Sequence, residues 1–100
     1  MGKIIWSPSS IEDPDDIEAY ISKDSLVYAI RMITRILDRV EVLHKFPEIG
    51  RLVPEISDNT QTRELPEGNY RIVNEQTHEE NIHIIRVLHM ARDFYKSGLI

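Results

Sequence analysis

The sequence of 100 residues contains no cysteine, which excludes disulfide bonds and thiol chemistry and agrees with a cytoplasmic location. It also lacks any run of about 18 apolar residues, so no transmembrane helix is expected. The apolar stretch in the opening "MGKIIWSPSS" is too short for a signal peptide. The length is typical of one domain. We therefore expect a single cytoplasmic domain over residues 1–100, with no membrane association.

Sequence patterns for common catalytic and cofactor sites are also missing. There is no glycine-rich phosphate loop and no Ser–His–Asp motif. His83 and His89 are six residues apart, without the carboxylate of a zinc motif. We therefore expect neither a metal nor a cofactor.

Positive charge is in short supply, since 12 Lys and Arg face 17 Asp and Glu, giving a net charge of −5. This balance disfavours a uniformly basic nucleic-acid binder. The acidic excess falls in residues 1–61, which carry 7 basic against 11 acidic residues, whereas residues 62–100 carry 5 against 6. The densest acidic cluster is "EDPDDIE" at 12–18. We interpret it as the solvated face of a helix.

The first helix is expected over residues 8–23. Ser7 is a suitable N-cap, and Pro8 suits the first helical turn. Pro14 leaves two alternatives open. It either kinks this helix, or it marks the true start of the helix with Asp13 as the cap.

Residues 25–45 give the clearest helical signal, with Ser25 as a plausible cap. Apolar residues recur there at helical spacing: Leu26, Ala29, Ile30, Ile33, Ile36, Leu37, Val40 and Leu43. Arg31, Arg35 and Arg39 recur on the other side. We interpret these arginines as solvated or as paired with the acidic first helix, in preference to an anion site.

The remaining elements are strands. Residues 3–6 are apolar, residues 46–61 are rich in loop formers, and residues 62–66, 69–76 and 81–89 have strand composition. The order strand–helix–helix–strand–strand–strand predicts an α+β fold. We expect the helical hairpin to cover one face of a small antiparallel sheet and the other face to be free for polar groups.

Several cationic side chains fall in this late hairpin. Strand alternation puts Arg71 with Val73 and Glu75, and puts Arg86 with Ile84 and Leu88, opposite His89. A subset of Arg63, Arg71 or Arg86, and His89 would then meet near a sheet end and match phosphate oxygens. In the alternative interpretation, each arginine pairs with a local glutamate such as Glu64 or Glu75. Spacing alone favours this second interpretation.

Five short motifs occur one after another along the chain. They are "WSPSS", "IEAYI", "LHKFPEIGRLVPE", "TRELPEGNYRIV" and "IHIIRVLHMARD". In this combination the sequence resembles the RelE/ParE superfamily of toxins from bacterial toxin–antitoxin, or plasmid stabilisation, modules. The resemblance runs through nearly the whole chain.

The resemblance implies a compact α+β toxin of the cytoplasm that a cognate antitoxin holds inactive. RelE-like members are endoribonucleases that cut messenger RNA on the ribosome. ParE-like members inhibit DNA gyrase and need no nuclease site. A third alternative is a degenerate toxin that only binds an antitoxin.

The resemblance also assigns site residues. Arg63, Tyr70, Arg71, His89 and Arg92 match motif positions. In RNA cleavage Arg63, Arg71 and Arg92 would stabilise charge on the phosphoryl oxygens. His89 or Glu55 would move protons.

Tyr70, Arg86 and Arg51 are assigned to substrate or partner binding. We expect Arg71, His89 and Arg92 to face solvent or a groove. Asn74 stands where the motif usually continues with tyrosine, and the net charge of −5 contrasts with the usual basic toxins. Both departures disfavour RNA cleavage.

Overall fold

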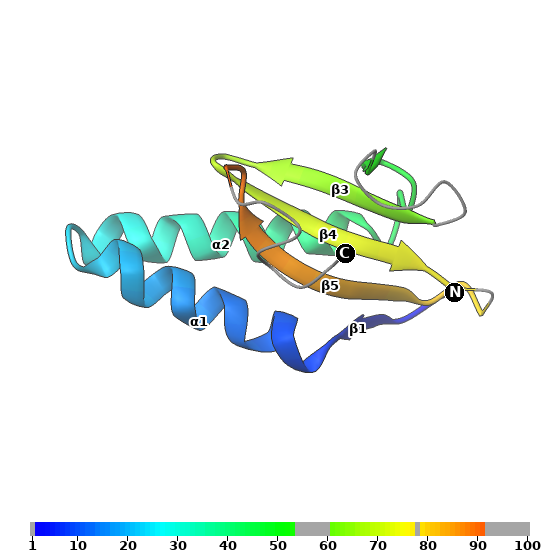
Figure 1. Ribbon diagram of the computed structural model, residues 1–100, viewed down its shortest axis with the longest axis horizontal. Coiled ribbons are helices and arrows are strands. Elements are labelled where there is room, and N and C mark those ends of the chain that lie inside the picture. The colour runs from blue at the N-terminus through cyan, green and yellow to red at the C-terminus, as the bar shows by residue number, and fades with distance from the viewer. Residues whose placement is uncertain (1, 54–60, 78, 92–100) are drawn as a thin grey trace.

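The computed structural model describes residues 2–53, 61–77 and 79–91. Its elements are listed here in chain order: β1 (Ile4–Trp6), α1 (Pro8–Ser22), α2 (Leu26–Val42), β2 (Arg51–Leu52), β3 (Thr62–Glu67), β4 (Tyr70–Gln76) and β5 (Ile82–His89). The strands form one sheet in the order β1-β5-β4-β3-β2 (Figure 1). No helix in these described ranges is long and apolar enough to cross a membrane.

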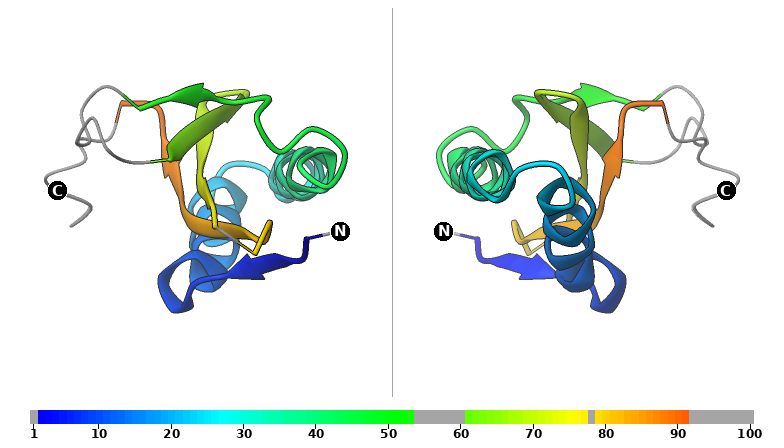
Figure 2. Two further views of the ribbon diagram at one scale, coloured as in Figure 1. Left: turned by 90° about the vertical axis from the view of Figure 1, so that its right-hand side faces the viewer. Right: turned by 90° about the vertical axis from the view of Figure 1, so that its left-hand side faces the viewer.

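Both helices lie on the same side of the sheet (Figure 2), so the predicted α+β fold with a helical layer is confirmed. The sheet differs from the prediction in two details. First, β1 pairs in parallel with β5. The two helices separate β1 from the later strands, so no tight turn forces it to be antiparallel. Second, the expected loop over 46–61 contains β2, which extends the sheet by pairing antiparallel with β3.

The start of α1 is settled by Ser7, whose Oγ accepts a hydrogen bond from the Ser10 amide at 3.0 Å. Pro8 occupies the first turn, and the helix passes through Pro14. Of the two alternatives for Pro14, the one with Asp13 as the cap is therefore wrong. Asp13 is instead buried inside the helix–sheet interface.

The predicted Ser25 cap of α2 is confirmed by its bond from the Tyr28 amide. The buried residues of this helix are Ala29, Met32, Ile36 and Val40. Three positions expected in the apolar stripe are exposed, namely Leu26, Ile30 and Leu37. Apolar side chains therefore occupy more of the circumference of α2 than the sheet and α1 bury.

The sheet separates two apolar clusters. The larger cluster joins both helices to the sheet and includes Ile17, Ile36, Ile72, Ile84 and Val87. The smaller one lies on the other face and consists of Val53, Val73 and Leu88, with Ile85 packed against it. Consecutive residues 87 and 88 thus belong to opposite faces, as strand geometry requires.

A β-bulge interrupts the pairing of β4 with β5. Val73 pairs with Arg86 and Asn74 pairs with Ile84, so that Ile85 is the extra residue. Asn74, the departure from the family motif, is buried at this bulge, and its Nδ2 donates to the Ile72 carbonyl at 3.1 Å. A bulge bends the strand and re-aims the side chains that follow it.

The bulge reverses the face of the sheet to which the later side chains of β5 point. Ile84 and Val87 both face the helices, whereas Ile85 and Leu88 face away. The expected grouping of Arg86 with Ile84 is therefore wrong. Arg86 and Leu88 both follow the bulge and still share a face, since they pair with Val73 and Arg71. One inserted residue shifts every later side chain to the opposite face.

The turn between β3 and β4 depends on Gly68, which has a left-handed φ of 59°. A Cβ at this position would also lie 3.0 Å from the Met32 Cε. We expect Gly68→Ala to lower the free energy of unfolding by roughly 1–2 kcal/mol, the cost of a side chain in this conformation. Urea denaturation measures this loss. Gly68→Asn should cost less, because asparagine adopts this conformation more readily. An alanine variant as stable as wild type would contradict the prediction.

Candidate functional site

Arg71 is only 5% exposed and lies on the sheet face away from the helices. Its Nη1 donates to Glu64 Oε2 at 3.0 Å. The other oxygen of Glu64 accepts from Arg51, at 2.7 Å from Nε. Arg71 therefore does not face solvent, and of the two interpretations its pairing with Glu64 is the one observed. Burying a guanidinium requires a carboxylate partner, and Glu64 on the neighbouring strand supplies it.

Arg63 binds backbone rather than a carboxylate. Its Nη1 donates to the Gly50 carbonyl at 2.8 Å. Arg63 thereby ties the segment that follows α2 to β3, next to the short pairing of β2 with β3. In this structure the side chain has a local structural contact.

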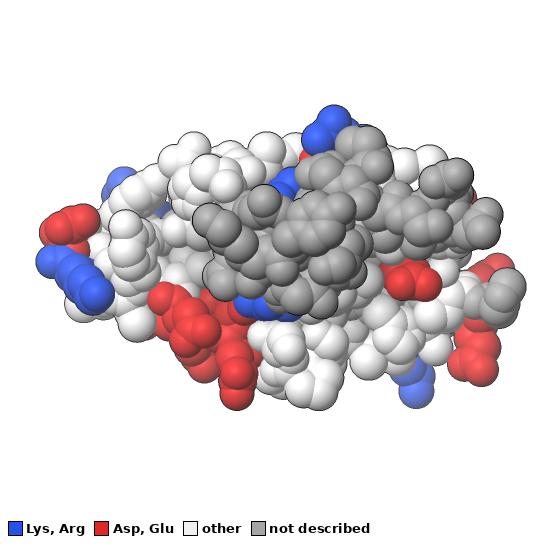
Figure 3. Space-filling model, viewed as in Figure 1, with Lys and Arg blue, Asp and Glu red and all other residues white. Residues whose placement is uncertain are grey.

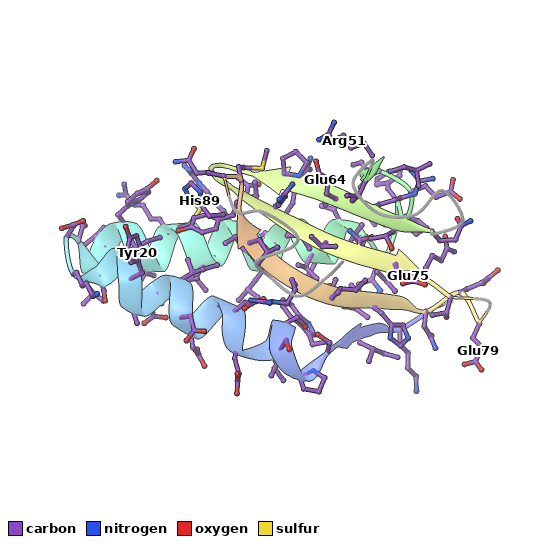
Figure 4. The ribbon with its side chains drawn as sticks, viewed as in Figure 1. Tyr20, Arg51, Glu64, Glu75, Glu79 and His89 are labelled. Atoms are coloured by element: carbon purple, nitrogen blue, oxygen red, sulfur yellow. The ribbon has the colours of Figure 1, made fainter. Side chains whose placement is uncertain are left out.

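Tyr70, Arg86 and His89 do come together. They line a cavity of about 430 Å³ between α1 and the adjoining ends of β4 and β5. The complete lining is Asp13, Asp16, Ile17, Tyr20, Tyr70, Arg86, Val87, Leu88 and His89. Figure 4 shows Tyr20 on α1 and His89 at the end of β5, at the same end of the molecule. His89 is exposed there, as expected.

An ion pair forms one wall of this cavity. Asp13 Oδ2 accepts from Arg86 Nε at 2.8 Å, and Oδ1 accepts from Nη2 at 3.0 Å. Oδ2 also accepts from the Val87 amide at 2.8 Å. The hydrogen bond to Asp13 raises the pKa of Arg86, so this guanidinium is charged under all ordinary conditions. Asp13 thus joins α1 to the strand just after the bulge.

The aromatic wall of the cavity is formed around Tyr70. The rings of Tyr70 and His89 meet edge to face, with centroids 5.4 Å apart and planes at 83°. These residues are a cross-strand pair of β4 and β5. Burial raises the pKa of Tyr70, as do the nearby Tyr28 and Tyr20 hydroxyls, so the Tyr70 phenol is protonated at neutral pH.

Acidic side chains gather over α1 on the face seen in Figure 3. The acidic residues of the cluster at 12–18 are exposed as predicted, with the exception of the buried Asp13. Asp16 is exposed and lines the cavity. Within the described ranges Asp16 forms no ion pair, and no ion pair joins Arg31, Arg35 or Arg39 to this helix.

Of the residues expected to meet at a phosphate, Arg86 and His89 line the same cavity, whereas Arg63 and Arg71 do not line it. Tyr70 pairs with His89, and Arg71 pairs with Leu88. Arg71 and His89 therefore point to opposite faces of the sheet. Arg63 is bonded to the loop before β2. Arg92 and Glu55 lie outside the described residues.

Two further features bear on chemistry. In the described part of the chain, no group of three His, Asp or Glu side chains lies close enough together to hold a metal ion. The cavity offers carboxylates, aromatic rings and one neutralised guanidinium. This combination is suited to binding a partner.

Sequence patterns do not single out Asp13, Asp16 or Tyr20 as residues of this cavity. From the sequence, Asp13 is expected as a cap or as part of a solvated helix face. The only signal for Asp13 was a carboxylate before a proline in the middle of a helix. Its partner lies 73 residues away along the chain, at Arg86.

Comparison with known proteins places this arrangement in a family. The family model of the ParE toxin of type II toxin–antitoxin systems (parDE) matches residues 4–94. No curated protein sequence matches the chain.

Solved structures show the same fold. The chromosomal ParDE toxin–antitoxin system from P. aeruginosa contains a chain with a TM-score of 0.70 and 20% identity. That match covers 89% of this chain and 96% of the other. The toxin–antitoxin complex RelBE2 from Mycobacterium tuberculosis contains one with a TM-score of 0.65 and 15% identity, covering 88% and 96%. The resemblance to the RelE/ParE superfamily is thus confirmed, and the chain belongs to the ParE toxin family of type II toxin–antitoxin systems.

Proposed function

We propose that this chain is a toxin that inhibits DNA gyrase by binding and does not cut RNA. The observation that carries the proposal is the separation of Arg71 from His89 on opposite faces of the sheet. A nuclease of the expected kind needs both groups at one phosphate, because the arginine stabilises charge while the histidine moves a proton.

The state of Arg71 supports the same conclusion. Its charge is offset by Glu64, which lies 3.0 Å away in a buried position. Recruiting this guanidinium to a phosphate would break a buried ion pair, which is costly. The net charge of −5 also opposes association with ribosomal RNA. A gyrase inhibitor of the ParE type needs only a binding surface.

A cognate antitoxin is the second part of the proposal. The family is defined by its place in type II toxin–antitoxin systems. Both solved relatives come from such systems. We expect the small protein encoded beside this chain to bind it and to suppress its effect on growth.

Expression of the chain without an antitoxin tests the target. We expect growth arrest with failed DNA supercoiling and with intact transcripts. The purified chain should block supercoiling of relaxed plasmid by gyrase, and prior addition of the antitoxin should restore it. Cleavage of ribosome-bound messages would instead support the RelE-like activity. Absence of growth arrest would support a degenerate toxin that binds only an antitoxin.

A matched variant sharpens this test. His89→Ala removes the proton-transfer group that a nuclease would use, at an exposed position whose loss should cost little stability. A binding toxin has no need of that proton transfer. We therefore expect no transcript cleavage from either form. Transcript cleavage by wild type that His89→Ala abolishes would contradict the proposal.

A further inference from the structure

We propose that the cavity between α1 and β5 receives an arginine side chain of the antitoxin, held by Asp16 and by the rings of Tyr20, Tyr70 and His89. This inference rests on the proposed antitoxin partnership and adds the chemistry by which one site recognises that partner. The cavity volume of about 430 Å³ lies in the range of ligand pockets.

The charge of the lining selects a cation. Asp13 and Arg86 neutralise each other through two hydrogen bonds. The carboxylate of Asp16 has no ion-pair partner among the described residues, so Asp13, Asp16 and Arg86 together contribute a net negative charge to the cavity. Figure 3 shows further acidic side chains along α1, the helix that forms one side of the cavity. An anion or a nucleic-acid phosphate is therefore repelled, whereas a basic protein segment is attracted.

The rings select a guanidinium over other cations. Tyr20, Tyr70 and His89 offer aromatic surface, and Tyr70 and His89 already hold each other at 83°. A planar guanidinium stacks on such rings and makes bidentate bonds to a carboxylate, which an ammonium cannot do. The amphipathic stem of arginine also suits the apolar side of the cavity at Ile17 and Val87.

The chain itself shows that one of these rings attracts a cation. Lys23 Nζ lies over the Tyr20 ring, 5.7 Å from its centroid. Lys23 is not part of the cavity lining, so it leaves the cavity itself accessible. This part of the rim thus favours positive charge, and among the described residues Lys23 is the cation that a partner would displace from the Tyr20 ring.

The first experiment measures binding kinetics of the small protein encoded beside this chain. Asp16→Asn should weaken affinity on the order of tenfold, mainly through faster dissociation, because a charge-assisted contact is lost. The matched control is Asp15→Asn, which changes the net charge equally at an exposed position outside the cavity. It should slow association slightly and leave dissociation unchanged.

Substitutions in the antitoxin complete the cycle. Each of its arginines is changed to lysine in turn, and one change should weaken binding of wild type but not of Asp16→Asn. Tight binding with equal, small effects of Asp15→Asn and Asp16→Asn would overturn this inference while leaving the proposed function intact. Failure of the adjacent protein to bind at all would remove the antitoxin partner and the inference with it, whereas the gyrase assay would still judge the toxin activity.

A second measurement needs no antitoxin. Titration with ethylguanidinium chloride, followed by amide NMR shifts, should perturb Tyr20, Tyr70 and His89 in wild type. The perturbation should be much smaller in Asp16→Asn and absent with sodium chloride. The same weak response in wild type and Asp16→Asn would overturn the proposed site.

Discussion

Replacing Asp13 by alanine is expected to lower the free energy of unfolding by about 3–5 kcal/mol, the usual cost of removing one partner of a buried ion pair. The Asp13 side chain is 7% exposed and that of Arg86 is 18% exposed. Alanine would take the carboxylate away from Arg86 and would also leave the Val87 amide without its acceptor. Since a domain of this size has a total stability of about 5–15 kcal/mol, the melting temperature should fall by more than about 10 °C.

Two variants of the same helix control this experiment. Asp16→Ala removes an exposed carboxylate that forms no ion pair within the described ranges, so it should change stability by about 0.5 kcal/mol or less. Asp13→Asn keeps one oxygen acceptor for the Val87 amide but loses the charge, so its stability should fall between the other two. Equal melting temperatures for Asp13→Ala and Asp16→Ala would show that the ion pair does not hold α1 on the sheet.

Arg71→Ala is expected to cost about 3 kcal/mol of the free energy of unfolding. Its partner Glu64 is 2% exposed and would remain buried with a single guanidinium, that of Arg51. An exposed catalytic arginine would behave differently, because its removal usually changes stability by no more than about 0.5 kcal/mol. Thermal unfolding followed by circular dichroism therefore separates a structural Arg71 from a functional one.

The control is Arg51, the other arginine that is bonded to Glu64. The Arg51 side chain is 67% exposed, so Arg51→Ala should cost at most about 1 kcal/mol, as is usual for surface pairs. The double variant Glu64→Leu with Arg71→Met should recover much of the loss of Arg71→Ala, since apolar residues can replace a buried ion pair. A melting temperature of Arg71→Ala close to that of wild type would contradict the assignment.

The sequence by itself determined both helices, four of the five strands and the family. The cap at Ser7, the helical period after Ser25 and the β-branched runs near the C-terminus are local signals, and each acts within a few residues. They sufficed for the α+β order and for the two-layer arrangement. The motif series was enough for the resemblance to toxins, which the family match confirms.

Only the tertiary structure decided what the charged residues do. The bulge at Ile85 reverses the faces of β5, and no local pattern announces one extra residue in a strand. Asp13 accepts hydrogen bonds from Arg86, 73 residues away in the sequence. Glu64 accepts hydrogen bonds from both Arg51 and Arg71, which lie on the two neighbouring strands. A buried charge takes whichever opposite charge the packed chain brings within reach, and that choice depends on strand register and helix placement rather than on spacing along the sequence.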